Sequence, residues 1–162
     1  MKQVVLLSLF FAGIIFIVGC APQGESPDQM IAEAKALDQK FNEMYNNGDV
    51  DGIMSLYWNS PDLVSYPPGD LELRGWESVK AGFIKDFGMT PRGKIEMIES
   101  NYKVAGDVVI SWGKWRYTMT EPPMEILGRY TDVKAKRDGK LVYIHDHASA
   151  PMPAPPDSVS GS

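Results

Sequence analysis

The residues of this chain best suited to acid–base chemistry are its two histidines, His145 and His147, two positions apart in the segment from Leu141 to Ser149. An unperturbed imidazole titrates close to neutral pH, so either side chain could take up and return a proton. Side chains on a β-strand alternate between faces, and residues two apart share a face. We therefore expect the two imidazoles to stand side by side, with Asp146 pointing the opposite way.

Three interpretations of this histidine pair stay open. As catalytic residues, His145 and His147 would act as acid and base, with the phenol of Tyr66 or Tyr130 as a proton donor. As zinc ligands they would need a carboxylate as a third protein ligand, and we predict no metal site. As structural residues they would lie on the outer side of the strand, because alternation fixes their common face but not which face it is.

The N-terminus has the pattern of an export signal over residues 1–19. Lys2 precedes an apolar run over residues 4–18, which is shorter than a comfortable membrane span. The segment Ile17-Val18-Gly19-Cys20 resembles a bacterial lipobox, in which the cysteine receives acyl chains such as palmitate and becomes the first residue of the mature protein. Acylation would also explain the single cysteine of an exported chain.

This pattern predicts a lipoprotein anchored in the bacterial cell envelope. In a Gram-negative cell it would sit on the outer membrane or face the periplasm. Ala21, in place of aspartate, weakly favours the outer membrane. Residues 20–27 would form the lipidated cysteine and a short polar tether.

Composition limits the function classes that fit the chain. The 162 residues are 44% hydrophobic and 23% charged, which is typical of a globular protein with one domain once the signal is removed. The formal net charge of −5 and the absence of a Lys/Arg cluster argue against nucleic acid as a partner. The sequence contains no Gly-rich nucleotide-binding loop, and we predict no cofactor.

The first half of the predicted domain, which spans residues 28–150, is helical. Ser26, Pro27 and Gln29 form a helix start with a capping box, and an apolar stripe of three- and four-residue spacing continues to a stop at Gly48. Asp49 can cap a second, short helix. A brief strand over residues 63–66 and a third helix over residues 75–87 follow.

The second half is read as four long strands, at residues 94–104, 108–119, 124–137 and 140–148. Asp138-Gly139 is a favoured type I′ hairpin pair and would fix the register of the last two strands. Residues 151–162 are rich in proline and serine, and we expect a disordered tail. Helices followed by a strand meander predict an α+β fold in which a curved antiparallel sheet wraps the helices around an interior pocket.

Several side chains are candidates to line that pocket. Aromatic residues with helical spacing or on the middle strands could form its walls, and one arginine could supply a positive charge; the candidates are Trp76, Phe83, Trp112, Arg129 and Tyr130. Trp112 and Trp115 are three residues apart, so on a regular strand they face opposite sides. The outward one would suit a dimer contact, and we expect a homodimer through the sheet.

Three local motifs resemble one family. They are Asn47-Gly48-Asp49-Val50-Asp51, Tyr66-Pro67-Pro68-Gly69 leading to Arg74-Gly75-Trp76, and Arg137-Asp138-Gly139-Lys140 leading to His145-Asp146-His147. Together with the element order, they are similar to the SnoaL-like and DUF4440 branch of the nuclear transport factor 2-like, or ketosteroid isomerase-like, superfamily, here as a bacterial lipoprotein. The end of the chain also resembles the association domain of calmodulin-dependent kinase II.

The resemblance implies a cone-shaped fold with a small-molecule pocket. The catalytic trio of ketosteroid isomerases has no matching positions here, and Asp132 stands where the kinase association domain has an arginine, so neither activity carries over. We predict a domain that binds a small, partly apolar molecule, with turnover undecided. Two alternatives are a cofactor-independent lyase, isomerase, dehydratase or cyclase using His145 or His147, and a structural dimer module.

Overall fold

The structure is a computed structural model and describes residues 25–151. Its helices are α1 (Pro27–Asn47), α2 (Val50–Met54) and α3 (Trp76–Gly88). Its strands are β1 (Val64–Tyr66), β2 (Leu73–Arg74), β3 (Lys94–Ala105), β4 (Val108–Met119), β5 (Met124–Arg137) and β6 (Lys140–Ser149). The element order predicted from the sequence is confirmed, and the two-residue strand β2 is an addition to it.

The caps of the first two helices follow from the local sequence. The hydroxyl of Ser26 accepts a hydrogen bond from the backbone N–H of Gln29, and the Gln29 side chain accepts one from the Ser26 N–H, which completes the capping box. Gly48 ends α1 in the left-handed region at φ 71°. Asp49 caps α2 by accepting from the Gly52 N–H at 2.8 Å.

The strands form one open, six-stranded sheet in the order β2-β1-β6-β5-β4-β3. All neighbouring pairs are antiparallel except β1 and β6, which run parallel. The predicted α+β fold with a curved sheet is confirmed. The parallel pair differs from the expected antiparallel sheet, because β1 enters the sheet beside the last strand of the chain.

The β5–β6 hairpin turns at Asp138 and Gly139, with φ values of 51° and 76°. Both residues occupy the left-handed region that a type I′ turn requires. A bulge between Val133 and Lys134 shifts the register farther along. Beyond the bulge, Asp132 lies directly opposite Asp146.

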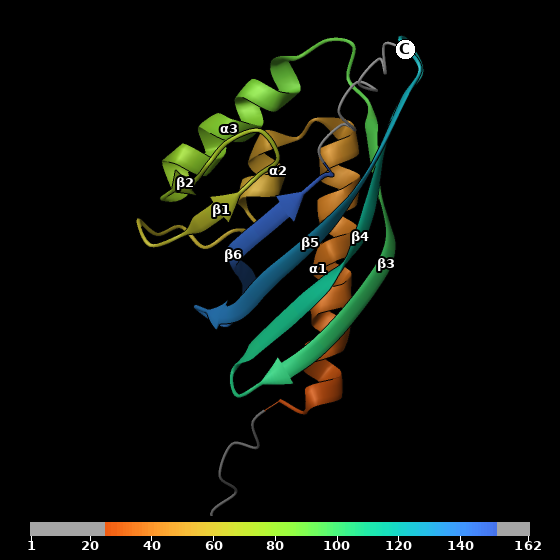
Figure 1. Cartoon of the computed structure of the whole chain (residues 1–162). Coiled ribbons are helices and arrows are strands. Elements are labelled where there is room, and N and C mark those ends of the chain that lie inside the picture. The colour runs from red at the N-terminus through yellow and green to blue at the C-terminus, as the bar shows by residue number, and fades with distance from the viewer. Residues whose placement is uncertain (1–24, 152–162) are drawn as a thin grey trace, which may run out of the picture.

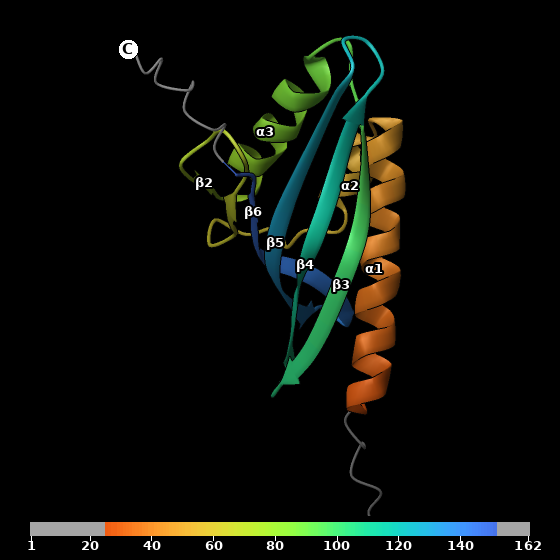
Figure 2. The same cartoon turned by 45° about the vertical axis from the view of Figure 1, so that its right-hand side comes forward.

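The sheet bends strongly, and the helices lie on its concave side (Figures 1 and 2). A second bulge, between Met97 and Glu99 in β3, adds to the bend. Helix α1 runs along the sheet and packs mainly on β3, while α2 and α3 lie near one end of it. Among the helices of the described residues, none has the length and apolar character needed to cross a membrane.

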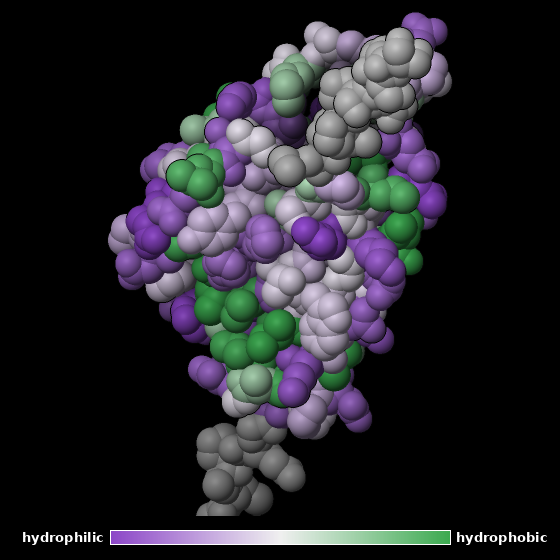
Figure 3. All heavy atoms as spheres, viewed as in Figure 1, coloured by the Kyte–Doolittle hydropathy of each residue, from purple (hydrophilic) through white to green (hydrophobic). Residues whose placement is uncertain are grey.

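The apolar core lies between the helices and this concave face. The larger cluster centres on α2 and on side chains from α1, α3 and β6, and includes Ile53, Leu63 and Val79. The convex, outer face of the sheet is a mosaic of hydrophilic and hydrophobic side chains in the view of Figure 3. The two faces of the sheet therefore differ in environment, which decides where chemistry can take place.

Candidate functional site

A cavity of about 660 Å³ lies between the concave face of the sheet and the helices. Helices α1 and α3, strand β1 and strands β3 to β6 all contribute to its lining. Most of the wall is apolar or aromatic, with Phe41, Phe83, Trp115, Ile126 and Tyr143 among the lining residues. A space of this size suits a small organic molecule.

Trp115 forms part of the cavity wall, and its position depends on a glycine. A Cβ added at Gly128 on the neighbouring strand would lie only 2.1 Å from the indole ring. The indole N–H donates to the carbonyl oxygen of Arg129 at 3.2 Å. The sequence prediction that Trp112 and Trp115 face opposite sides is confirmed, because Trp115 is buried and Trp112 is exposed.

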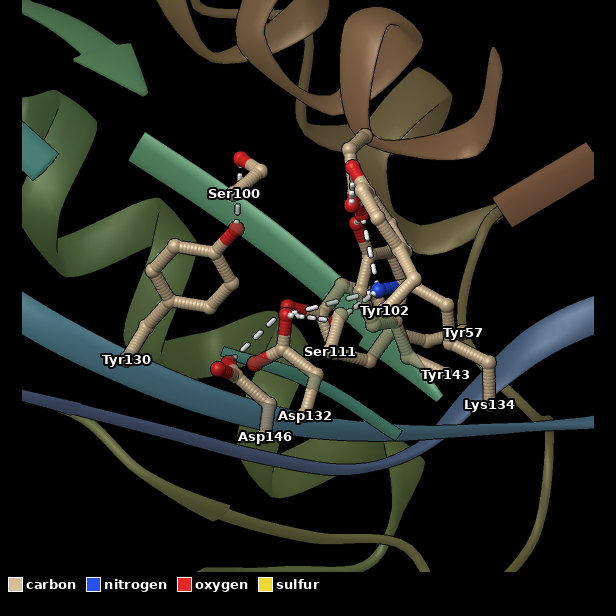
Figure 4. A network of polar contacts seen from close by, with 10 residues as sticks. Tyr57, Ser100, Tyr102, Ser111, Tyr130, Asp132, Lys134, Tyr143 and Asp146 are labelled. Atoms are coloured by element: carbon tan, nitrogen blue, oxygen red, sulfur yellow. Dashed lines mark hydrogen bonds and ion pairs between the residues drawn. The ribbon is translucent and has the colours of Figure 1, made fainter. Parts of the chain in front are cut away.

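Two carboxyl groups face each other on the cavity wall. Asp132 and Asp146 are cross-strand partners on β5 and β6, and their carboxyls form a hydrogen bond (Figure 4). A carboxyl–carboxyl hydrogen bond needs a proton on one of the two groups. The pair therefore combines a proton donor and a proton acceptor in one site.

The environment of this pair indicates which member carries the proton. Burial raises the pKa of Asp132 well above its usual range, and the charge of Asp146 raises it further, while the Lys134 ammonium lowers it. Asp146 also accepts hydrogen bonds from the hydroxyls of Tyr57 at 3.0 Å and Ser65 at 3.1 Å. The burial of Asp132 and the hydroxyls that donate to Asp146 both favour the shared proton on Asp132.

A buried lysine supports the pair from behind. The Lys134 side chain is fully buried, and its Nζ lies 2.9 Å from Asp38 Oδ1 and 3.6 Å from Asp132 Oδ2. Lys134 also donates to the hydroxyl of Ser111, which in turn donates to Asp132 at 3.4 Å. This lysine is not among the residues that line the cavity. It balances charge inside the network.

Three tyrosines complete the network. Tyr102 donates to Asp38 at 2.8 Å, and Tyr143 donates to the other oxygen of the same carboxylate. Burial, with the nearby negative charge of Asp38, raises the pKa of Tyr143 well above its ordinary value. Tyr130 donates to Ser100 at 2.7 Å, and burial raises its pKa to about 12. These phenols stay protonated at neutral pH.

The two histidines lie on the other side of the sheet. Neither His145 nor His147 lines the interior cavity. His147 is exposed and borders a shallow outer depression of about 490 Å³. The ring of Tyr66 meets both imidazoles edge to face, at centroid distances of 5.5 and 6.1 Å, and its hydroxyl donates to Glu72 at 3.0 Å. The three predicted catalytic residues are thus brought together, but on the outer face.

The predicted pocket residues divide between the two faces. Phe83 and Tyr130 line the interior cavity. Trp76 packs against the apolar core, and its indole N–H donates to the carbonyl of Met54 at 3.2 Å. Trp112 and Arg129 border the outer depression. The predicted lipidation residue, Cys20, and most of the predicted tail lie outside the described residues.

The sequence analysis did not select the inner carboxyl pair. Alternation correctly placed Asp146 on the face opposite the histidines. Asp132 is two positions from the buried Tyr130 on β5 and therefore shares its face. A usable signal was the run Tyr130-x-Asp132-x-Lys134, which repeats polar groups at every second position. On the inner side of a strand such a pattern indicates a buried polar network.

Comparison with known proteins places the chain in a family. The sequence profile of the SnoaL-like domain matches residues 34–153. No curated protein gives a significant match. An NTF2-like protein of unknown function from Shewanella oneidensis aligns with a TM-score of 0.65 and 21% identity, over 74% of this chain and 98% of that chain.

Two further solved structures share the fold. A proposed calcium/calmodulin-dependent protein kinase II association domain from Xanthomonas campestris has a TM-score of 0.64 and 26% identity, over 75% of this chain and 87% of its own. A proposed dehydratase of the NTF2-like family from Streptomyces avermitilis has a TM-score of 0.68 and 16% identity, over 78% of this chain and 100% of its own. The chain belongs to the SnoaL-like domain family, within the NTF2-like superfamily.

Proposed function

We propose that this domain binds a small, largely apolar molecule in its interior cavity, with the polar group of the ligand at the Asp132–Asp146 pair. The observation that supports this proposal is a mostly apolar space of about 660 Å³ with one hydrogen-bonded carboxyl pair on its wall. Small-molecule sites commonly combine apolar walls with a few converging polar groups. The walls would supply affinity, and the pair would orient the ligand.

A neutral probe tests whether the cavity is the binding site. We expect 2-naphthylmethanol to bind the full chain, measured as a saturable change in naphthyl fluorescence. Ala148 lines the cavity, so Ala148→Trp should fill part of it and weaken binding at least about tenfold, since a blocked pocket loses apolar contact. Thr131→Trp adds the same side chain at the outer depression and is the matched control.

The two variants separate the two faces. Weak binding to Ala148→Trp with unchanged binding to Thr131→Trp supports the interior site. The reverse pattern, or no saturable binding to the wild-type chain, contradicts the proposal. Thermal melts of both variants show whether each one is folded.

A second candidate function is cofactor-independent turnover, as a lyase or isomerase. The observation in its favour is the carboxyl pair, because two hydrogen-bonded carboxyls that hold one proton offer both a proton donor and a proton acceptor. Exchange of the α-protons of 2-tetralone in D₂O, followed by NMR, tests it. Catalysed exchange that is lost in Asp146→Asn supports turnover; exchange no faster than in buffer argues for binding alone.

We also propose that the domain is held at the cell envelope through acylated Cys20. The support is the lipobox-like segment and the short polar tether before α1. Metabolic labelling with palmitate should mark the wild-type chain and leave Cys20→Ser unlabelled. Persistent labelling and membrane partitioning of Cys20→Ser would contradict this anchor.

The homodimer through the sheet stays a proposal. Trp112 on β4 and Leu127 on β5 are 41% and 49% exposed, and exposed apolar side chains suit a protein contact. Sedimentation velocity should show a dimer for the wild-type chain and a monomer for Trp112→Glu. A wild-type monomer would contradict the proposal.

A further inference from the structure

The hydroxyl donors near the carboxyl pair are all committed to acceptors within the protein. Tyr57 and Ser65 donate to Asp146, Tyr143 donates to Asp38, and Tyr130 donates to Ser100. The Trp115 indole N–H is also engaged, by the backbone. A ligand that reaches this part of the cavity therefore meets acceptor oxygens rather than free donors.

Other polar groups that line the cavity also have partners within the protein, and the Asp86 carboxyl on α3 accepts from the Tyr45 hydroxyl at 2.6 Å. Lys85 on α3 pairs with Asp70 at 3.4 Å, and its side chain is 71% exposed. The hydroxyl of Tyr117 accepts from the Gly93 N–H at 2.7 Å, where the loop after α3 enters β3. Among the described residues that line the cavity, Lys85 is the only lysine or arginine, and its partner is Asp70.

The charges of the buried network do not cancel. Lys134 and Asp38 form an ion pair, and the facing carboxyls of Asp132 and Asp146 hold one proton between them in their hydrogen bond (Figure 4). The carboxylate of Asp146 has hydroxyl donors but no cation paired with it among the described residues. This network thus leaves one negative charge at the carboxyl pair, on the wall of a largely apolar space, and a bound cation would balance it.

We propose that the ligand is an organic amine, bound as its ammonium form, with the N–H donors on Asp146 and an apolar body against the aromatic wall. The proposal rests on the proposed binding function and names its ligand class. A carboxylate ligand would meet the like charge of Asp146. A ketone would find no free donor. An alcohol could donate one hydrogen bond but would leave the charge unbalanced.

The aromatic wall suits the rest of such a molecule. Phe41 on α1 and Phe83 on α3 pack edge to face, with 6.3 Å between their ring centroids, and Trp115 lines the cavity from strand β4. Aromatic rings bury apolar surface and also attract a nearby cation through their π faces. An amine with a ring-containing body would use both properties.

A matched set of probes tests the ligand class. We expect the full chain to bind 2-naphthylmethylamine at least about tenfold more tightly than 2-naphthylmethanol, because a charge-assisted hydrogen bond is stronger than a neutral one. We expect 2-naphthoate to bind more weakly than both. Isothermal titration calorimetry at neutral pH measures all three, and the three probes share one naphthyl body.

Two variants tie the preference to Asp146. In Asp146→Asn the amine should lose its advantage and bind within about threefold of the alcohol, because the charge that it pairs with is gone. Asp107→Asn removes the same charge from the exposed β3–β4 turn and should keep the wild-type preference. This control excludes a general attraction of cations to an acidic protein.

The outcomes separate this inference from the proposed function. If the alcohol or the acid binds the interior more tightly than the amine, the amine proposal is overturned and the cavity remains a binding site. If the amine preference survives in Asp146→Asn, the amine is recognised elsewhere and the proposal fails. If no probe binds the wild-type chain, the proposed function fails as well.

Discussion

Strands β5 and β6 carry two different sets of titratable groups on their two faces. On the inner face, Asp132 and Asp146 hydrogen-bond to each other beside a fully buried lysine. On the outer face, His145 and His147 stand against the ring of Tyr66, and His147 is exposed. The histidines of the outer face are the residue type that ordinarily titrates near neutral pH, but burial raises the pKa of Asp132 on the inner face. For acid–base chemistry, the side of the sheet on which a residue lies therefore matters more here than the ordinary pKa of its side chain.

The largest effect that this comparison predicts is on stability. We expect Lys134→Met to lower the free energy of unfolding by about 3–5 kcal/mol, because Asp38 would be left as an unpaired buried charge. Lys114→Met is the matched control, since Lys114 pairs with Glu99 on the surface and should contribute less than about 1 kcal/mol. Urea unfolding measures both. Equal effects would show that the inner network is not special.

The next effect is a pH dependence on the inner face. Because the pKa of Asp132 is raised by folding, the unfolded chain ionises this group first as the pH rises above about 4, and folding stability falls. Asp132→Asn cannot ionise and mimics the protonated acid. The melting temperature of Asp132→Asn, relative to that of the wild-type chain, should therefore rise between pH 4 and pH 7.

An exposed aspartate provides the control for this pH dependence. Asp107→Asn should differ from the wild-type chain by a nearly constant amount over the same pH range. If Asp132→Asn also shows a constant difference, the Asp132 carboxyl titrates as an exposed one would, and its role as the acid of the pair is lost.

The smallest effects are expected on the outer face. Neither imidazole makes a hydrogen bond to another described residue, so His145→Ala and His147→Ala should each change the unfolding free energy by less than about 1 kcal/mol. Both variants should bind 2-naphthylmethanol as the wild-type chain does. A loss of binding in either would move the site to the outer face.

The sequence was sufficient to predict most of the fold. The capping box at Ser26, the αL stop at Gly48 and the Asp138-Gly139 turn are local signals, and each forms as predicted. The strand bounds of β4 and β5 also agree with the periodicity. The parallel pairing of β1 with β6 joins residues about eighty positions apart and has no local signal.

The site was harder to predict because the C-terminal half of β6 carries titratable side chains on both of its faces. Alternation separates His145 and His147 from Asp146, but it assigns neither set to the interior. Strand pairing decides which set faces the interior, because it places Asp146 opposite the buried Asp132. The bulge between Val133 and Lys134, which lies between this pair and the hairpin turn, shifts the register. Tertiary pairing therefore decides which side chains meet the cavity.

The most direct test of the interior site uses two tryptophans of β4. Trp115 lines the cavity and Trp112 borders the outer depression. In ¹H–¹⁵N spectra of the full chain, with the indole signals assigned by Trp→Phe variants, titration with 2-naphthylmethanol should shift the Trp115 indole signal to saturation and leave that of Trp112 in place. A saturating shift of Trp112 with Trp115 unmoved would contradict an interior binding site.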